Sequence, residues 1–154
     1  MNIVEILDDL QRQKITRYIL ESLPEWFGIP ESREEYIQDS IGKIFFCAYS
    51  DKKPIGFLYL KETGKDTVEL AVMGVLKEHH RKGIGKDLFE CAKKVISQKG
   101  YSFIQVKTVQ MGKYVDYDKT NRFYQALGFK EFEVFPTLWD EWNPCQVYVK
   151  YIGK

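Results

Sequence analysis

A basic, glycine-containing segment is the part of this sequence best suited to bind an anion. It runs from Lys77 to Lys86 (KEHHRKGIGK) and lies between a predicted strand and a predicted helix. The first-turn amides of a helix have no partner inside the helix, and the helix dipole is positive there, so this position favours phosphate. Glycine allows close approach of backbone, and the segment adds the charges of Arg81, Lys82 and Lys86. We expect either a phosphate-binding loop or a solvated basic turn.

Two other phosphate-binding motifs do not fit this segment. A dinucleotide-binding fingerprint needs GxGxxG, and Leu88 occupies the place of the third glycine. A P-loop needs GxxxxGK followed by Ser or Thr, but His80 replaces its first glycine and Asp87 follows Lys86. The loop is therefore neither of these motifs.

The elements that must position this loop can be predicted from hydrophobic periodicity and turn residues. Apolar and β-branched runs predict strands, helical spacing predicts helices, and Asp118 is expected to cap the last helix. We expect strands at 2–7, 43–50, 54–61, 67–76, 101–109, 129–135 and 145–152, and helices at 8–23, 30–40, 83–100 and 119–127. Gly74, inside the central strand, suggests a bulge or the close approach of a ligand to the backbone. The order βααβββαβαββ predicts an α/β fold around one mixed sheet.

Two segments resemble the motifs of one enzyme family. ELAVMGVLKEHHRKGIGKDLF resembles motif A of the GNAT superfamily of acetyl-CoA-dependent N-acetyltransferases, and TNRFYQALGF resembles its motif B. The resemblance implies a single GNAT-type domain over residues 1–154, with a mixed central sheet of about seven strands flanked by four helices. The sequence departs from the family at two positions. His80 stands where motif A has Arg or Gln, and Tyr117 stands where the family often has a cofactor-contacting Asn.

The resemblance also implies a binding mode for acetyl-CoA as co-substrate. The central strand and the strand after the crossover splay apart in this family, and pantetheine binds like an added strand. The residues that match this edge are Met73, Gly74 and Val75. The pyrophosphate would rest on the amides of Arg81, Lys82, Gly83, Ile84, Gly85 and Lys86, with Tyr117 as a further donor. We expect no metal, because His79 and His80 lack further ligands at a fitting spacing.

Two residues match catalytic positions of the family. Tyr124 matches the tyrosine that protonates the leaving thiolate, and a phenol is protonated at neutral pH. Glu69 matches the glutamate that serves as general base in several members. Other interpretations remain open: Tyr124 can simply pack on an apolar helix face, Glu69 can face solvent or pair with a lysine, and a water relay can replace the base.

The acceptor site is expected in two aromatic and acidic segments, Leu23–Tyr36 and Phe135–Cys145. Aromatic faces and carboxylates suit a cation on an apolar frame. The substrate-binding candidates are Trp26, Phe27, Tyr36 and Trp139. The same aromatics could instead cover the core or form a dimer face.

Composition restricts the partners. The 154 residues carry 23 Lys and Arg against 22 Asp and Glu, a net charge of +1, which argues against general binding to nucleic acid or anionic membranes. The three cysteines form no CxxC pair, the first residues lack a secretory pattern, and no apolar run reaches membrane-spanning length. We expect a cytoplasmic monomer or homodimer.

These observations favour an N-acetyltransferase that moves the acetyl group of acetyl-CoA directly to a primary amine of a small molecule or peptide. The alternative is a non-catalytic acyl-CoA-binding or sensory module of the same fold. A third interpretation is an interaction protein that uses the Trp-rich segment.

Overall fold

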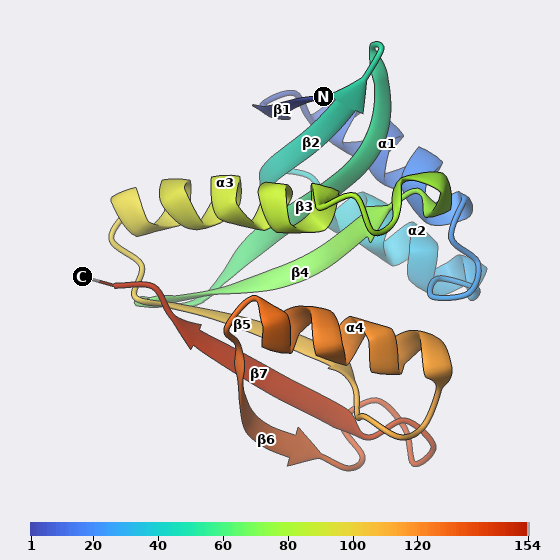
Figure 1. Cartoon of the computed structure of the whole chain (residues 1–154), viewed down its shortest axis with the longest axis vertical. Helices are drawn as coiled ribbons and strands as arrows, with labels where there is room; N and C mark the ends of the chain where they lie inside the picture. The colour runs from blue at the N-terminus through green and yellow to red at the C-terminus, as the bar shows by residue number, and fades with distance from the viewer. Residues whose placement is uncertain (154) are drawn as a thin grey trace. The chain divides into compact units, whose positions relative to one another are not determined.

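The helices and strands follow the order β1 α1 α2 β2 β3 β4 α3 β5 α4 β6 β7, with a short 3-10 turn, η1, before α3 (Figure 1). The computed structural model describes residues 1–153. The strands are β1 Asn2–Glu5, β2 Ile44–Ser50, β3 Lys53–Gly64, β4 Thr67–Val75, β5 Phe103–Val109, β6 Lys130–Phe135 and β7 Cys145–Tyr151. The helices are α1 Asp9–Glu21, α2 Pro30–Asp39, α3 Ile84–Gln98 and α4 Val115–Ala126, and η1 is Lys77–His79. The predicted order of elements is confirmed.

The sheet has seven strands in the order β1-β2-β3-β4-β5-β7-β6. The β4–β5 pair is parallel and registers Thr67 with Phe103, Val68 with Ile104 and Glu69 with Gln105. The pairs β1–β2, β2–β3, β5–β7 and β6–β7 are antiparallel. The predicted mixed sheet with four helices is therefore confirmed.

The chain forms two compact units. The first unit comprises Met1–Lys61 and Ala71–Lys99, and the second comprises Glu62–Leu70 and the residues from Gly100 onward. Both units contain part of β4: the first has its end, from Ala71 on, and the second has its start, which pairs with β5. Each unit has its own buried side chains.

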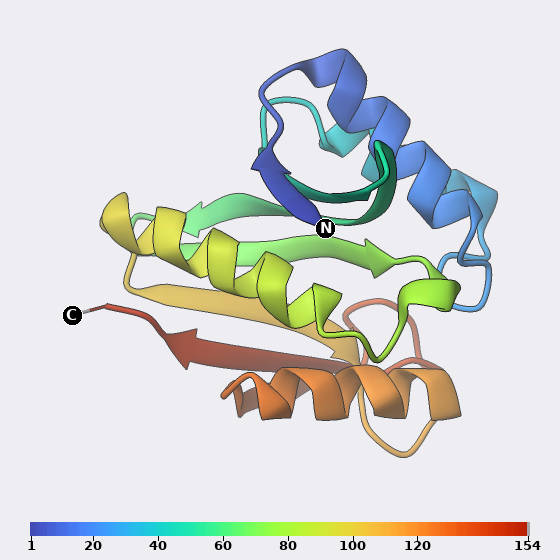
Figure 2. The ribbon, with the colours of Figure 1, turned by 45° about the horizontal axis from the view of Figure 1, so that its top comes forward.

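The first unit has helices on both faces of its strands (Figure 2). A Cβ placed on Gly74 of β4 would lie 2.9 Å from Ile19 of α1, whereas one on Gly56 of β3 would lie 3.3 Å from Leu88 of α3. The core between α1 and the strands includes Phe45 and Phe57, which stack 5.4 Å apart. Helix α1 begins as predicted, because the Asp8 carboxylate accepts the Gln11 amide hydrogen at 2.9 Å.

The second unit packs α4 on one face of β5 and β7. Tyr124 of α4 is buried against Phe129 and Tyr148, with ring centroids 5.7 and 6.3 Å away. Strand β6 lies at the edge of the sheet, and its register with β7 shifts between Glu131 and Glu133. Phe132 of this strand is 65% exposed. No helix of residues 1–153 is both long enough and apolar enough to span a membrane.

The predicted start of the last helix is wrong. Helix α4 begins at Val115, four residues before the predicted Lys119, and the Asp118 amide already bonds the Tyr114 carbonyl at 2.9 Å. The Asp118 carboxylate instead accepts the Gly112 amide hydrogen at 2.7 Å. The first turn includes Val115, which is 71% exposed, so hydrophobic periodicity could not reveal it.

Candidate functional site

The loop between η1 and α3 has left-handed backbone at two positions just before the helix begins. Arg81 and Gly83 both have left-handed backbone, with φ of 63° and 77°. The first amide bonded along α3 is that of Asp87, which donates to the Gly83 carbonyl, and Gly83 makes no side-chain cap. The amides of residues 84–86 therefore belong to a helix start that no side chain caps.

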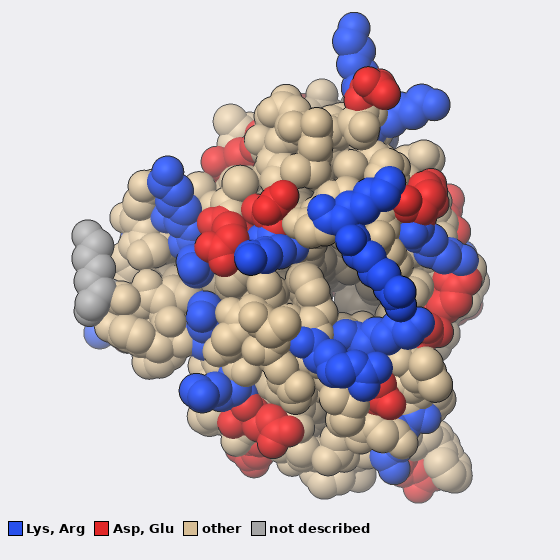
Figure 3. Space-filling view, in the orientation of Figure 1, with Lys and Arg blue, Asp and Glu red and all other residues tan. Residues whose placement is uncertain are grey.

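The side chains of this loop include three exposed basic residues and one buried apolar residue, Ile84. Arg81, Lys82 and Lys86 are exposed, and Lys and Arg side chains gather over the segment between η1 and α3 (Figure 3). No described atom lies within 4 Å of a Cβ placed on Gly83. Ile84 is buried, so it can offer a ligand only its backbone, while Gly85 beside it is half-buried. The predicted loop residues are thus neighbours at one helix end.

His80, which stands where motif A has Arg or Gln, contacts the end of β4. Its Nε2 lies 2.6 Å from the Val75 carbonyl, which can only accept, so Nε2 carries the hydrogen. Its ring meets Trp26 edge to face at 5.8 Å. The histidine therefore ties the loop back to the end of β4.

The end of β4 is closely covered by α1. A Cβ on Gly74 would meet Ile19 at 2.9 Å and Leu23 at 3.1 Å, so glycine is required here by the approach of a helix. The sequence suggested a bulge or a ligand close to Gly74, whereas the close atoms belong to Ile19 of α1 and to Leu23 just after it. Met73 and Val75 on either side are half-buried.

Tyr124 is buried, but its hydroxyl is not sealed off. The side chain is 8% exposed, and its Oη makes no hydrogen bond among residues 1–153. Within the same residues, the only fully buried side-chain polar atom without a partner is Arg12 Nε. The Tyr124 Oη therefore retains some contact with solvent. Burial raises the pKa of this phenol far above its usual value, so it stays protonated.

Glu69 is paired with a lysine. Its Oε1 lies 2.6 Å from Lys107 Nζ, and their side chains are 10% and 27% exposed. Of the alternatives left open for Glu69, exposure to solvent is excluded and pairing is observed. An ion pair so little exposed is screened less than a surface pair.

Glu69 and Tyr124 lie on opposite faces of the sheet in the second unit. Glu69 is registered with Gln105, whereas Tyr148, which contacts Tyr124, is registered with Val106. Registered residues share a face and successive residues alternate, so Glu69 and Tyr148 point to opposite sides. The structure does not bring the two predicted catalytic side chains together on one face.

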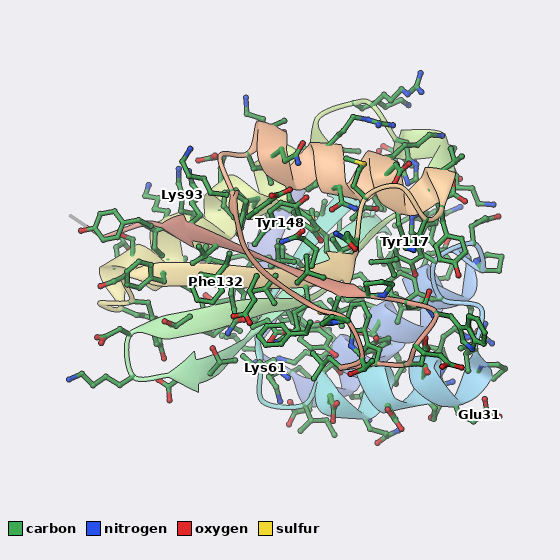
Figure 4. The ribbon with its side chains drawn as sticks, turned by 90° about the horizontal axis from the view of Figure 1, so that it is seen from below. Glu31, Lys61, Lys93, Tyr117, Phe132 and Tyr148 are labelled. Atoms are coloured by element: carbon green, nitrogen blue, oxygen red, sulfur yellow. The ribbon has the colours of Figure 1, made fainter. Side chains whose placement is uncertain are left out.

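The hydrogen bonds made by the buried side chain of Asn121 were not predicted from the sequence. Asn121 is fully buried, its Nδ2 donates to the carbonyls of Val109 and Tyr117 at 2.8 and 2.7 Å, and its Oδ1 accepts from Tyr148 Oη at 2.6 Å. It therefore joins α4 to β5 and β7, one turn before Tyr124. Figure 4 shows the side chains of Tyr117 and Tyr148 extending from α4 and β7. The only signal was a polar residue on the inner face of a predicted helix.

The acceptor candidates lie in different surroundings. In the first unit, Trp26 contacts His80, and Phe27 meets Tyr36 edge to face at 5.9 Å. The side chain of Tyr36 is 36% exposed. In the second unit, Trp139 is 47% exposed in the β6–β7 loop, where Asp140 accepts the Trp142 and Asn143 amide hydrogens.

Two of the acids expected to attract a cation already have partners. Lys77 binds Glu25, and this hydrogen bond is the main cause that lowers the pKa of the Glu25 carboxyl. Asp140 is used within its own loop, where the Asn143 side chain does most to lower its pKa. In the described part of the chain, no group of three or more His, Cys, Asp or Glu is arranged to hold a metal ion.

Comparison with known proteins identifies the class. The family model of the acetyltransferase (GNAT) domain matches residues 42–131, a range with residues in both units, and the chain belongs to this family. An uncharacterised N-acetyltransferase of Chlorobaculum tepidum is 28% identical over 120 residues, which are 76% of this chain and 64% of that protein. The matched segment thus spans less than two thirds of that relative's length.

Solved structures share the whole fold. A GNAT-family acetyltransferase from Desulfovibrio desulfuricans aligns with a TM-score of 0.83 at 19% identity, covering 98% of both chains. An aminoglycoside 6′-N-acetyltransferase solved with coenzyme A aligns with a TM-score of 0.75 at 20% identity, covering 99% of this chain and 97% of that one. The predicted family and fold are confirmed.

Proposed function

We propose that residues 1–154 form one N-acetyltransferase domain that transfers the acetyl group of acetyl-CoA directly to a primary amine of a small molecule or peptide. The observation that carries the proposal is the uncapped start of α3 at the left-handed Gly83, with three exposed cations beside it. The aminoglycoside 6′-N-acetyltransferase of similar fold was solved with coenzyme A, which supports the proposal by analogy.

The described residues fit a pyrophosphate. Free space over Gly83 lets an anion approach the backbone, and the first-turn amides of α3 with Arg81, Lys82 and Lys86 offer donors and charge. The proposal assigns the backbone of Met73, Gly74 and Val75 to the pantetheine arm, although His80 already occupies the Val75 carbonyl. Tyr117 is assigned to the cofactor in place of the family's Asn.

Tyr124 has the properties of a general acid. In the proposed reaction the acetyl carbon forms a bond to the amine nitrogen while its bond to sulfur breaks. Coenzyme A departs as a thiolate, which takes up a proton to become the thiol. A phenol with a raised pKa and an unpaired, solvent-touching hydroxyl can donate that proton at neutral pH. The packing of Tyr124 against Phe129 and Tyr148 fixes the direction of the ring.

Glu69 is assigned the role of general base. Its ion pair with Lys107 holds the carboxyl group in a buried place. The same pair also fits a purely structural role for Glu69, in which case a water relay replaces the base. The pH profile of kcat/KM in Glu69→Gln separates these two routes.

Acceptor binding is assigned to Trp26, Phe27 and Tyr36 of the first unit, and Trp139 of the second unit is a separate candidate. Their rings favour an amine carried on an apolar frame. Because Glu25 and Asp140 already have partners, the aromatic rings carry more of this assignment than the acids do. A small amine, an aminoglycoside-like compound and a peptide amine all fit.

The test is an acceptor screen that detects both products. Purified protein is incubated with acetyl-CoA and a panel of amines, free thiol is measured, and acetylated amine is identified by mass. Acetylated product that disappears in Tyr124→Phe supports the enzyme. Coenzyme A binding with no product across the panel supports the non-catalytic module instead.

A further inference from the structure

Two loops of the first unit are joined by side-chain contacts that the proposed reaction does not itself require. One is the segment Leu23–Phe27 after α1, which holds the acceptor candidates Trp26 and Phe27. The other is the segment Lys77–Gly83, which leads into the proposed pyrophosphate site. Their connection consists of a ring contact and an ion pair.

The loop after α1 has a fixed base. The amides of Trp26 and Phe27 both donate to the Leu23 carbonyl, at 3.2 and 3.0 Å. Leu23 itself is buried above Gly74 of β4. The backbone that carries Trp26 is therefore anchored to the end of the helix and to the strand beneath it.

The loop before α3 is folded back on the same strand. The His79 amide donates to the Leu76 carbonyl, the His80 amide donates to the Lys77 carbonyl, and the His80 ring reaches the Val75 carbonyl at 2.6 Å. The next residue, Arg81, has left-handed backbone at φ 63°. The position of His80 thus sets where the chain enters the proposed pyrophosphate loop.

Two side-chain contacts cross between these loops. The Trp26 ring meets the His80 ring edge to face, with centroids 5.8 Å apart and planes at 71°. Beside it, Lys77 binds the Glu25 carboxylate, and the charge of His80 also contributes to the lowered pKa of Glu25. A movement of His80 therefore changes the surroundings of Trp26 directly.

We propose that His80 is a positioning residue that couples the proposed pyrophosphate loop, residues 81–86, to the acceptor candidate Trp26. The inference rests on the proposed function. Binding of coenzyme A fixes the loop that starts at His80, and through the His80–Trp26 contact it fixes the ring that meets the acceptor. Because coupling between two sites is reciprocal, acceptor binding at Trp26 strengthens coenzyme A binding by the same factor. This gives the replacement of Arg or Gln by His a role of its own.

The test uses coenzyme A as the probe and the fluorescence of Trp26 as the readout. Trp139→Phe and Trp142→Phe remove the two other tryptophans, which are exposed at 47% and 72%. Coenzyme A is expected to change Trp26 emission in this background. His80→Arg restores a residue typical of the family and should abolish the emission change while coenzyme A still binds. His79→Ala, at the adjacent histidine, is the control and should keep both.

A double-mutant cycle supplies the second measurement. Coenzyme A affinity is determined by calorimetry for the parent, His80→Ala, Trp26→Ala and the double variant. Coupled residues should depart from additivity by about fivefold or more. Additive effects, or an emission change that survives in His80→Arg, would overturn the coupling while leaving the proposed function intact. Failure of the parent protein to bind coenzyme A would overturn both.

Discussion

The ammonium group of Lys107 lies 2.6 Å from the carboxylate of Glu69, on the face of the sheet opposite to Tyr124. The structure therefore does not place the proposed base and the proposed acid side by side. Because the carboxylate is little exposed, Lys107 also supplies the charge that balances it. The following experiments separate these roles.

Glu69→Gln keeps the size of the side chain and removes its charge. If Glu69 is the base, turnover should fall by about 10²-fold or more, and the acidic limb of the pH profile of kcat/KM should be lost. Initial rates between pH 5 and 9 measure both effects. An unchanged pH profile assigns the step to water or to another residue. Glu90→Gln, in the exposed pair with Lys93, is the matched control.

Tyr124→Phe removes only the hydroxyl. Turnover should fall by about 10²-fold or more at unchanged coenzyme A affinity, because the hydroxyl acts on the leaving group and not on the nucleotide. Since burial raises the pKa of Tyr124, its ionisation should give no basic limb below about pH 10. Full turnover at saturating substrates would remove Tyr124 from this role. The exposed Tyr18→Phe serves as control.

Gly74→Ala tests the packing of α1 on β4. The added methyl would lie 2.9 Å from Ile19 and 3.1 Å from Leu23, so overpacking should destabilise the protein by about 1–3 kcal/mol. Gly64→Ala is the control, since no described atom lies within 4 Å of its Cβ. Thermal or urea unfolding compares the two. Equal stability of the two variants would contradict the close approach.

Alkaline pH should destabilise the protein through its buried tyrosines. Burial is the main cause that raises the pKa of Tyr59, so the folded state holds this proton more tightly than the unfolded chain. Its contribution to stability is therefore complete below about pH 10, the unfolded pKa, and is lost as the pH rises further. Urea unfolding at pH 8 to 11 measures the slope. Tyr59→Phe should flatten it, whereas Tyr18→Phe should not.

The elements and the loop could be predicted because their signals are local. Gly83 with the helix that follows it is one short stretch of sequence, and the motif B segment TNRFYQALGF is another, so each could be recognised by itself. The alternation of predicted strands and helices was enough to predict the fold. The partners of Glu69 and Asn121 could not be predicted, because Lys107 and Tyr148 reach them through strand register. The role of Gly74 likewise depends on a helix about fifty residues earlier in the chain.

The most direct test of the central claim is a calorimetric titration of the protein with acetyl-CoA. We expect saturable binding that falls at least tenfold in Arg81→Gln/Lys82→Gln/Lys86→Gln, because these charges flank the first turn of α3. A variant with the same loss of charge, Lys52→Gln/Lys53→Gln/Lys99→Gln, changes exposed residues of the β2–β3 turn and the far end of α3 and should bind normally. No binding to the folded protein, or equal weakening in both variants, would contradict the assignment of this loop to acetyl-CoA.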